Sequence, residues 1–335
     1  MKPLIKTLTE TAAPSGYEAP IREIIHAEIK DLADEIKIDA LGNLIARKVP
    51  AKNAKNPKKV MLAAHMDEIG LMVNHVDENG YVRFTQLGAL MPHVLVGARV
   101  RFLNGTYGVI ATEYLDAGRR SKLQPLNKMF IDVGATSPKD CPVKTGDVAA
   151  IERPFHDLGK RLIAKSMDNR ISVAVQIEIM RQLKDNANDV YFVFTTQEEV
   201  AVRGATTSAY GVDPEIGIAI DVCPTGDTPD APTKDVELGK GPAVKIKDPG
   251  MIADPRIVDW MIKGAEKAKI PYQREVSELG STDARAIQTA RAGVMAGNIS
   301  VPCRYVHSPS EMVDYDDVQN TVKLLVALLG KEIKL

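Results

Sequence analysis

Two side chains that can bind a metal ion follow the apolar run at residues 60–64. His65 and Asp67 are separated by a single residue, so on an extended chain their side chains lie on the same face. Imidazole nitrogens and carboxylate oxygens are ligands for divalent first-row metals such as zinc, cobalt and manganese. A turn would also explain the pair, because Asp is common where strands end. The ends of the other apolar runs decide between these two interpretations.

The other apolar runs that we predict to be strands are also followed by His or acidic side chains. Asp168 lies where a helix is predicted to begin. The full set is His65, Asp67, Asp168, Glu198, Glu199, Asp221 and His307. Each residue alone has a simpler explanation, such as helix capping for Asp168. In an open α/β sheet, however, ligands bind beyond the carboxyl ends of the strands, so we expect these side chains to meet at one edge.

The charge of this set indicates a pair of metal ions. Five of its members are carboxylates, and carboxylates gathered away from water repel one another and lose hydration. Two divalent cations, held by one bridging carboxylate and a few terminal ligands, would offset that repulsion and leave a carboxylate free for catalysis. The residues alone therefore predict a two-metal hydrolase.

The elements that must position these side chains alternate in type along the chain. Residues 18–34 have apolar side chains at helical spacing, and residues 35–48 alternate around Gly42 and Asn43 as in a hairpin. From residue 157 onward, fully apolar runs alternate with predicted helices. Such strands are typical of a mostly parallel sheet that is covered by helices on both faces. We therefore expect an α/β fold with a mixed, mostly parallel sheet packed between helices.

The segment between these two parts has a different sequence pattern. Residues 71–152 show short alternating runs without a helical period, including a strong hairpin signal at Asn104-Gly105. We expect a catalytic α/β domain formed by residues 1–70 plus 155–335, interrupted by an all-β domain at residues 71–154. A chain of 335 residues is long enough for two domains.

Composition excludes several classes of partner. The 43 basic and 44 acidic residues give a net charge of −1. The chain therefore has no excess of positive charge that would favour binding to nucleic acid or to an anionic membrane. No apolar run reaches the length of a membrane span, and we expect no targeting segment at the N-terminus. The three cysteines form no C-x-x-C pair, which favours reduced thiols and a cytoplasmic location.

The motifs also resemble a known family. The stretches AAHMDEIG, KSMDNR, QEEVAVRGA, AIDV, GSTDA and RYVHSPSEM are similar, in order and context, to those of the M42 metallo-aminopeptidases. The resemblance covers nearly the full length and implies a zinc-exopeptidase-like sheet with an inserted dimerisation domain. It implies an exopeptidase that acts on peptides with a free N-terminus. It also implies that the enzyme forms dimers, which can assemble into a tetrahedral dodecamer.

The resemblance also assigns roles to individual residues. It implies that Asp168 bridges two metal ions, zinc or cobalt, with Glu199 and His307 completing one and His65 and Asp221 the other. Glu198 is then the general base for a metal-bound water, and Asp67 orients His65, which agrees with the carboxylate that ligating imidazoles commonly contact.

This chain departs from the family pattern at two positions, neither of them a ligand, and we expect the second, Ser281, to lie near the substrate. Ala201 and Ser281 stand where the family often has Gly. Asp283 and Arg285, which follow Ser281, could recognise a charged N-terminal residue. Helix-start electrostatics and an ordinary surface charge also explain them, so we expect a preference for neutral N-terminal residues.

Three other functions remain open from the residues. Glu198 and Glu199 could be a glycosidase pair, although adjacent residues rarely reach the required separation of roughly 5 to 9.5 Å. Cys303 and His307 could form a thiol hydrolase. The metals could also serve only the assembly of a non-catalytic protein, but such a site has no need of the spare carboxylate of Glu198.

Overall fold

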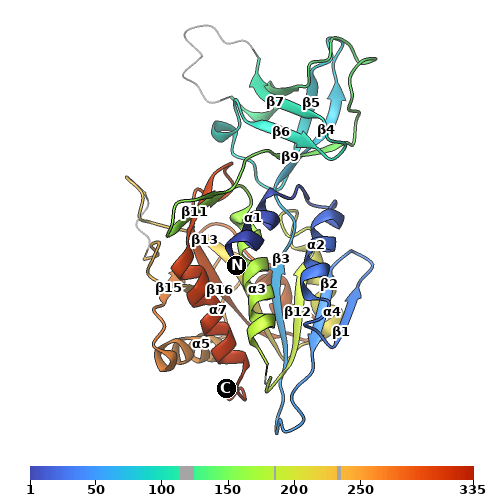
Figure 1. Ribbon diagram of the computed structural model, residues 1–335. Helices are drawn as coiled ribbons and strands as arrows, with labels where there is room; N and C mark the ends of the chain where they lie inside the picture. Colours follow the sequence, from blue (N-terminus) through green and yellow to red (C-terminus); the bar gives the residue numbers. More distant parts are fainter. Residues whose placement is uncertain (114–123, 185, 232–234) are drawn as a thin grey trace.

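Two β-sheets of different construction organise the chain (Figure 1). The computed structural model describes residues 1–113, 124–184, 186–231 and 235–335. The larger sheet has eleven strands and is packed between helices, and the smaller sheet is a closed barrel. In Figure 1 the barrel lies at one end of the larger sheet, and the C-terminus lies at the other.

The larger sheet has a parallel centre and antiparallel margins. Its main path runs β1 (Glu35–Ile38), β2 (Leu44–Lys48), β12 (Asp189–Thr195), β3 (Lys59–His65), β13 (Ile216–Pro224), β16 (Met295–Arg304), β17 (Glu311–Asp314), β11 (Arg161–Ala164) and β10 (His156–Asp157). Off this path, β14 (Ala243–Lys247) pairs with β16 and with β15 (Gln273–Val276).

Fewer strand pairs are parallel than a mostly parallel sheet would have. Strands β12, β3, β13 and β16 are mutually parallel, and β14 is parallel to β15. The remaining pairs, including β1 with β2 and β10 with β11, are antiparallel. Short turns such as the one closed by Asp39 and Asn43 can join only antiparallel neighbours, because parallel neighbours need a long crossover. The sheet as a whole is therefore mixed.

Helices cover both faces of this sheet, as the fully apolar strands predict. On one face lie α1 (Lys2–Glu10), α2 (Ala19–Ile29), α3 (Met167–Gln182), α5 (Pro255–Ala268) and α7 (Tyr315–Leu329), and on the other lie α4 (Arg203–Val212) and α6 (Asp283–Gln288). Successive residues of β3 point to opposite faces: Leu62 packs in the core on the α3 side, and Met61 packs with Ile287 of α6. Both side chains are fully buried.

The barrel has a core of its own. Its strands are β4 (Gly70–Val76), β5 (Val82–Leu87), β6 (Arg99–Phe102), β7 (Tyr107–Thr112), β8 (Met129–Asp132) and β9 (Val148–Ile151), with 3-10 turns η1 (Pro92–Val94) and η2 (Leu126–Lys128). Inward side chains such as Phe84, Val100 and Ile131 are buried together. The predicted hairpin at Asn104-Gly105 joins β6 to β7, with Gly105 at a φ of +91° that favours glycine. Within the described part of residues 70–151 there is no α-helix.

Some elements differ from the sequence-based expectation. Helix α6 ends at Gln288, and beyond it Arg291 and Gly293 take φ values of +50° and +103°, which do not continue a helix. Helix α4 and the short strands β10, β11, β14, β15 and β17 were not predicted. Across the described residues, no helix combines the length and apolar character that crossing a bilayer requires.

Candidate metal centre

The parallel strands bring the predicted metal ligands to one edge of the large sheet. His65 is the last residue of β3, and it lies opposite Thr195 at the end of β12. The chain then continues to Glu198 and Glu199. Asp221 lies in β13, level with Ser300 of β16. His307 follows β16, and Asp168 lies in the first turn of α3.

Asp168 lies between the two imidazoles. Its Oδ1 is 3.1 Å from Nε2 of His65, and its Oδ2 is 3.3 Å from Nε2 of His307. Two groups of possible ligand atoms, each within 4.8 Å, share this carboxylate. One contains His65, Asp168 and Asp221, and the other contains Asp168, Glu199 and His307. One carboxylate therefore has an oxygen available to each of two adjacent positions.

Glu198 belongs to neither ligand group. Its Oε2 is 3.9 Å from Nε2 of His65, and its side chain is 11% exposed. Both Glu198 and Glu199 line a cavity of about 460 Å³ that also contains His65 and His307. Glu198 therefore faces the same cavity as the ligand groups while its carboxylate remains outside them.

Burial and mutual repulsion shape the protonation of the cluster. Burial raises the pKa of Glu198 and of Asp221 well above their usual values, and the charge of Asp221 adds to the rise at Glu198. Burial acts in the same direction on Asp168, but hydrogen bonds with His307 and His65 hold its pKa below the usual value. The protein alone thus supplies too little positive charge for all of these carboxylates to ionise together.

Two observations show that these residues could hold metal ions. Oε1 of Glu199 is buried, and the described residues offer it no hydrogen-bond donor in good geometry. The available donors are imidazole nitrogens and carboxylate oxygens, with no thiolate in either group. Such donors suit zinc, cobalt and manganese.

Asp67 connects the two strand ends that carry the cluster. It is fully buried, and its Oδ1 lies 3.4 Å from Nδ1 of His65. Its carboxylate accepts hydrogen bonds from the hydroxyl of Ser15 at 2.6 Å and from the backbone N–H groups of Glu198 at 3.0 Å and Glu199 at 3.3 Å. It therefore lies against the imidazole and holds the backbone of the Glu198–Glu199 loop.

Two further carboxylates that the sequence did not single out support the cluster. Glu311 accepts hydrogen bonds from the backbone N–H of Asp168 and of His307. Glu68 accepts from Nζ of Lys165 at 2.5 Å, which ties the end of β3 to the segment before Asp168. Glu68 directly follows Asp67 and Glu311 lies four residues after His307, so proximity to the ligands was the only available signal.

The cavity beside the cluster contains residues from distant parts of the chain. Met91, from the barrel segment, lines it together with Leu279, Ser281 and Arg285. The hydroxyl of Ser281 donates to Asp248 at 3.1 Å.

Asp283 has a structural role near this cavity. It is buried at the start of α6, where it accepts a hydrogen bond of 2.5 Å from Thr195. Its position agrees with helix-start electrostatics rather than with a surface that meets substrate.

Cys303 is not placed as a nucleophile. It is fully buried in β16, and burial raises the pKa of its thiol well above the usual value. The reactive form of cysteine is the thiolate, so this environment argues against the Cys303–His307 hydrolase.

Comparison with known proteins decides the family. The profile described as M42 glutamyl aminopeptidase matches residues 42–324. This chain belongs to the M42 peptidase family. The M42 chain is 38% identical over 344 residues to the lysyl aminopeptidase of Pyrococcus furiosus, with 99% of this chain and 97% of that protein covered.

Solved structures agree with this membership. The aminopeptidase APDkam598 from Desulfurococcus kamchatkensis matches with a TM-score of 0.93 at 38% identity, covering 98% of this chain and 94% of that one. The Pyrococcus horikoshii TET1 peptidase, which can assemble into a tetrahedron or a large octahedral shell, matches with a TM-score of 0.87 at 33% identity and 98% coverage of both chains. The M42 protein is thus a metal-dependent aminopeptidase, as its motifs predicted.

Proposed function

We propose that this aminopeptidase uses two divalent metal ions at the cluster around Asp168. The observation that carries the proposal is the position of Asp168 between His65 and His307, at 3.1 and 3.3 Å. Asp168 would contribute to holding both ions, Glu199 and His307 would hold one of them, and His65 and Asp221 would hold the other. Zinc or cobalt suits these nitrogen and oxygen donors.

The remaining carboxylates have distinct roles in this proposal. When bound, the metal ions supply Lewis acidity, which polarises the scissile carbonyl and lowers the pKa of water. Glu198 lies beside the ligands without belonging to either group, so it is free to accept a proton from water and deliver it to the leaving amine. Asp67 holds His65 in place.

The substrate is a peptide with a free N-terminus. The apolar side chains of Met91, Leu279 and Val306 line the cavity, which supports the expected preference for a neutral N-terminal residue. Lys245 also lines it, but its ammonium is paired with Glu275 at 2.6 Å. Arg285 is the cavity residue that would instead favour an acidic N-terminal residue.

The barrel is proposed as the dimerisation domain, residues 71–154, of a homo-oligomer whose catalytic domain is residues 1–70 plus 155–335. Its surface exposes Val96, Tyr107 and Val109, whose exposed fractions are 57%, 55% and 44%. Exposed apolar side chains of this kind favour contact with another subunit. The assembly of the TET1 peptidase into a tetrahedron supports a dodecamer here. A cytoplasmic location belongs to the same proposal.

The test is hydrolysis of unblocked leucyl, lysyl and glutamyl anilides. Untreated protein, chelated protein, and chelated protein restored with zinc or with cobalt are compared, together with their metal content. We expect activity to vanish on chelation, to return at two metal ions per subunit, and to be highest on the leucyl substrate. Full activity at one ion per subunit would contradict the dinuclear site, and a higher rate on the glutamyl substrate would contradict the neutral preference.

A further inference from the structure

A second cavity lies at the opposite edge of the large sheet from the metal centre. It has a volume of about 390 Å³ and is formed by α5, the end of α7 and the residues that follow α7. The side chain of Asn188, just before β12, donates to the carbonyls of Leu329 and Lys331 at 2.8 and 2.9 Å. The seven residues of β12 span about 20 Å at roughly 3.3 Å per residue. This cavity is therefore separate from the active site.

The cavity is rich in positive charge, most of which is neutralised locally. The ion pairs at its wall are Arg256 with Asp254 at 2.7 Å, Lys263 with Asp259 at 2.6 Å, and Lys334 with Glu332 at 3.4 Å. Two lining cations remain, Lys267 and Lys331. The part of the chain that the structure describes offers neither of them a carboxylate within ion-pair distance.

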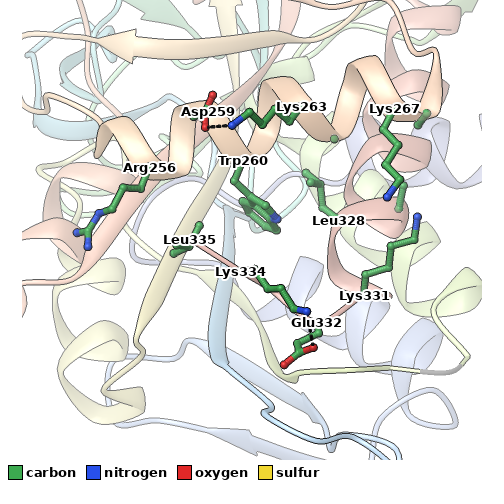
Figure 2. Close-up of a pocket in the computed structure, with 13 residues that line it drawn as sticks. Arg256, Asp259, Trp260, Lys263, Lys267, Leu328, Lys331, Glu332, Lys334 and Leu335 are labelled. Atoms are coloured by element: carbon green, nitrogen blue, oxygen red, sulfur yellow. Dashed lines mark hydrogen bonds and ion pairs between the residues drawn. The ribbon is translucent and has the colours of Figure 1, made fainter.

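The two unpaired lysines approach one region from different elements. Lys267 lies in the last turn of α5, and Lys331 follows the end of α7. Figure 2 shows their side chains pointing toward one another across the cavity. Two ammonium groups in this arrangement repel each other and attract an anion between them. A phosphate monoester, with about −1.5 to −2 charges at pH 7, matches two lysines better than a single carboxylate does.

Part of the cavity lining is apolar and comes from Gly264, Ala268, Ala327 and Leu328. A Cβ atom added at Gly264 of α5 would lie 2.4 Å from Cδ2 of Leu328 in α7, so glycine allows these two helices to touch. Beside them, Trp260 extends from α5 into the cavity (Figure 2). An indole offers a flat surface on which a planar ring can stack. The volume falls in the range of small-molecule sites, about 300 to 1,000 Å³.

We propose that this cavity binds a phosphate monoester carried on a planar ring, with Lys267 and Lys331 holding the phosphate and Trp260 contacting the ring. The inference is independent of the proposed metal mechanism, because none of its residues touches the active-site cavity. Its test therefore needs no catalysis.

Trp260 makes the test direct, because it is the single tryptophan of the chain. Its fluorescence is recorded while adenosine monophosphate, adenosine or inorganic phosphate is added to the full-length oligomer. We expect a saturable change with adenosine monophosphate and displacement of that ligand by phosphate. Adenosine should need at least about tenfold higher concentration, because it lacks the charged hydrogen-bonding group.

Two double variants complete the experiment. K267Q/K331Q should raise the dissociation constant of adenosine monophosphate by about tenfold or more. K37Q/K323Q removes the same charge from exposed positions outside the cavity and should leave the constant unchanged. Both should retain wild-type aminopeptidase activity, which verifies folding. Absence of a saturable signal, equal affinity for adenosine, or an unchanged constant in K267Q/K331Q would each overturn the proposal.

Discussion

Glu311 accepts a hydrogen bond of 2.9 Å from the backbone N–H of Asp168. Its other carboxylate oxygen accepts one of 2.7 Å from the backbone N–H of His307. Glu311 begins β17, whereas Asp168 is the second residue of α3, so one buried side chain holds the backbone of two proposed ligands that come from different elements. The spacing of those proposed ligands is therefore supported by a residue that belongs to neither ligand group.

Replacing Glu311 with Gln should weaken metal binding. An amide can accept from only one of the two N–H groups and presents its own donors to the other, so the ligand backbone should shift. Loss of such support typically costs about 10- to 100-fold in metal affinity. Equilibrium dialysis against buffered zinc measures the change, with the exposed Glu332→Gln variant as the control. Equal affinity in the two variants would show that Glu311 does not position the site.

Replacing Asp67 with Asn should also lower metal affinity, by about 10- to 100-fold. The carboxylate of Asp67 accepts from the N–H groups of both Glu198 and Glu199 and faces His65, which a neutral amide cannot do equally well. Ser15→Ala removes one hydrogen bond to Asp67 but keeps its charge, so it should have a smaller effect. The same dialysis ranks the two variants, and a larger loss in Ser15→Ala would contradict this role.

Replacing Ala201 with Gly should stabilise the fold. Ala201 has a φ of +88°, a conformation that is costly for a residue with a Cβ atom and free for glycine. After the greater entropy of glycine in the unfolded chain is subtracted, we expect a gain of about 0.5–1 kcal/mol. Urea unfolding measures it. Ala205→Gly, inside α4, is the control and should destabilise by about 1 kcal/mol. A loss of stability in Ala201→Gly would refute the argument.

The pair formed by Arg304 and Asp227 should make stability depend on pH. Two hydrogen bonds join them, at 3.0 and 2.6 Å. Burial alone would raise the pKa of Asp227, but Arg304 holds it well below its usual value. The folded pKa is therefore lower than the unfolded one, so this stabilisation is complete above the unfolded pKa and is lost as pH falls through the folded pKa.

The comparison of wild type with Asp227→Asn isolates that contribution. At pH 7 the variant should be less stable by about 1 kcal/mol, and the difference should shrink below about pH 4, near the unfolded pKa of aspartate. Urea unfolding at several pH values measures it. A difference that stays constant down to pH 3 would mean that the charge of Asp227 contributes nothing.

Much of the candidate site followed from local sequence patterns. Strand spacing indicated that His65 and Asp67 share a face, and apolar runs located the strand ends beside Glu198, Asp221 and His307. These signals are local because a strand that is buried on both faces appears in the sequence as a continuous apolar run. The run ends where the chain leaves the sheet at its edge. The structure brings these side chains together at that edge.

Other features depend on contacts that no local pattern encodes. Glu311 supports Asp168 across 143 positions of sequence, and its surroundings in the sequence resemble an ordinary loop. Some antiparallel pairs at the margin of the sheet join strands that lie far apart along the chain, as with Arg161 of β11 and Asp314 of β17. Lys267 and Lys331 likewise line one cavity only because α5 packs against α7.

In the proposed mechanism, Glu198 transfers protons while the proposed ligands hold two metal ions. The most direct measurement is metal content and turnover of Glu198→Gln beside Glu199→Gln, both assayed on the leucyl anilide after loading with zinc. Glu198→Gln should keep two ions per subunit while kcat falls by about 10²- to 10⁴-fold, whereas Glu199→Gln should lose metal. Loss of metal in Glu198→Gln in proportion to its loss of activity would make Glu198 a ligand and contradict the assignment.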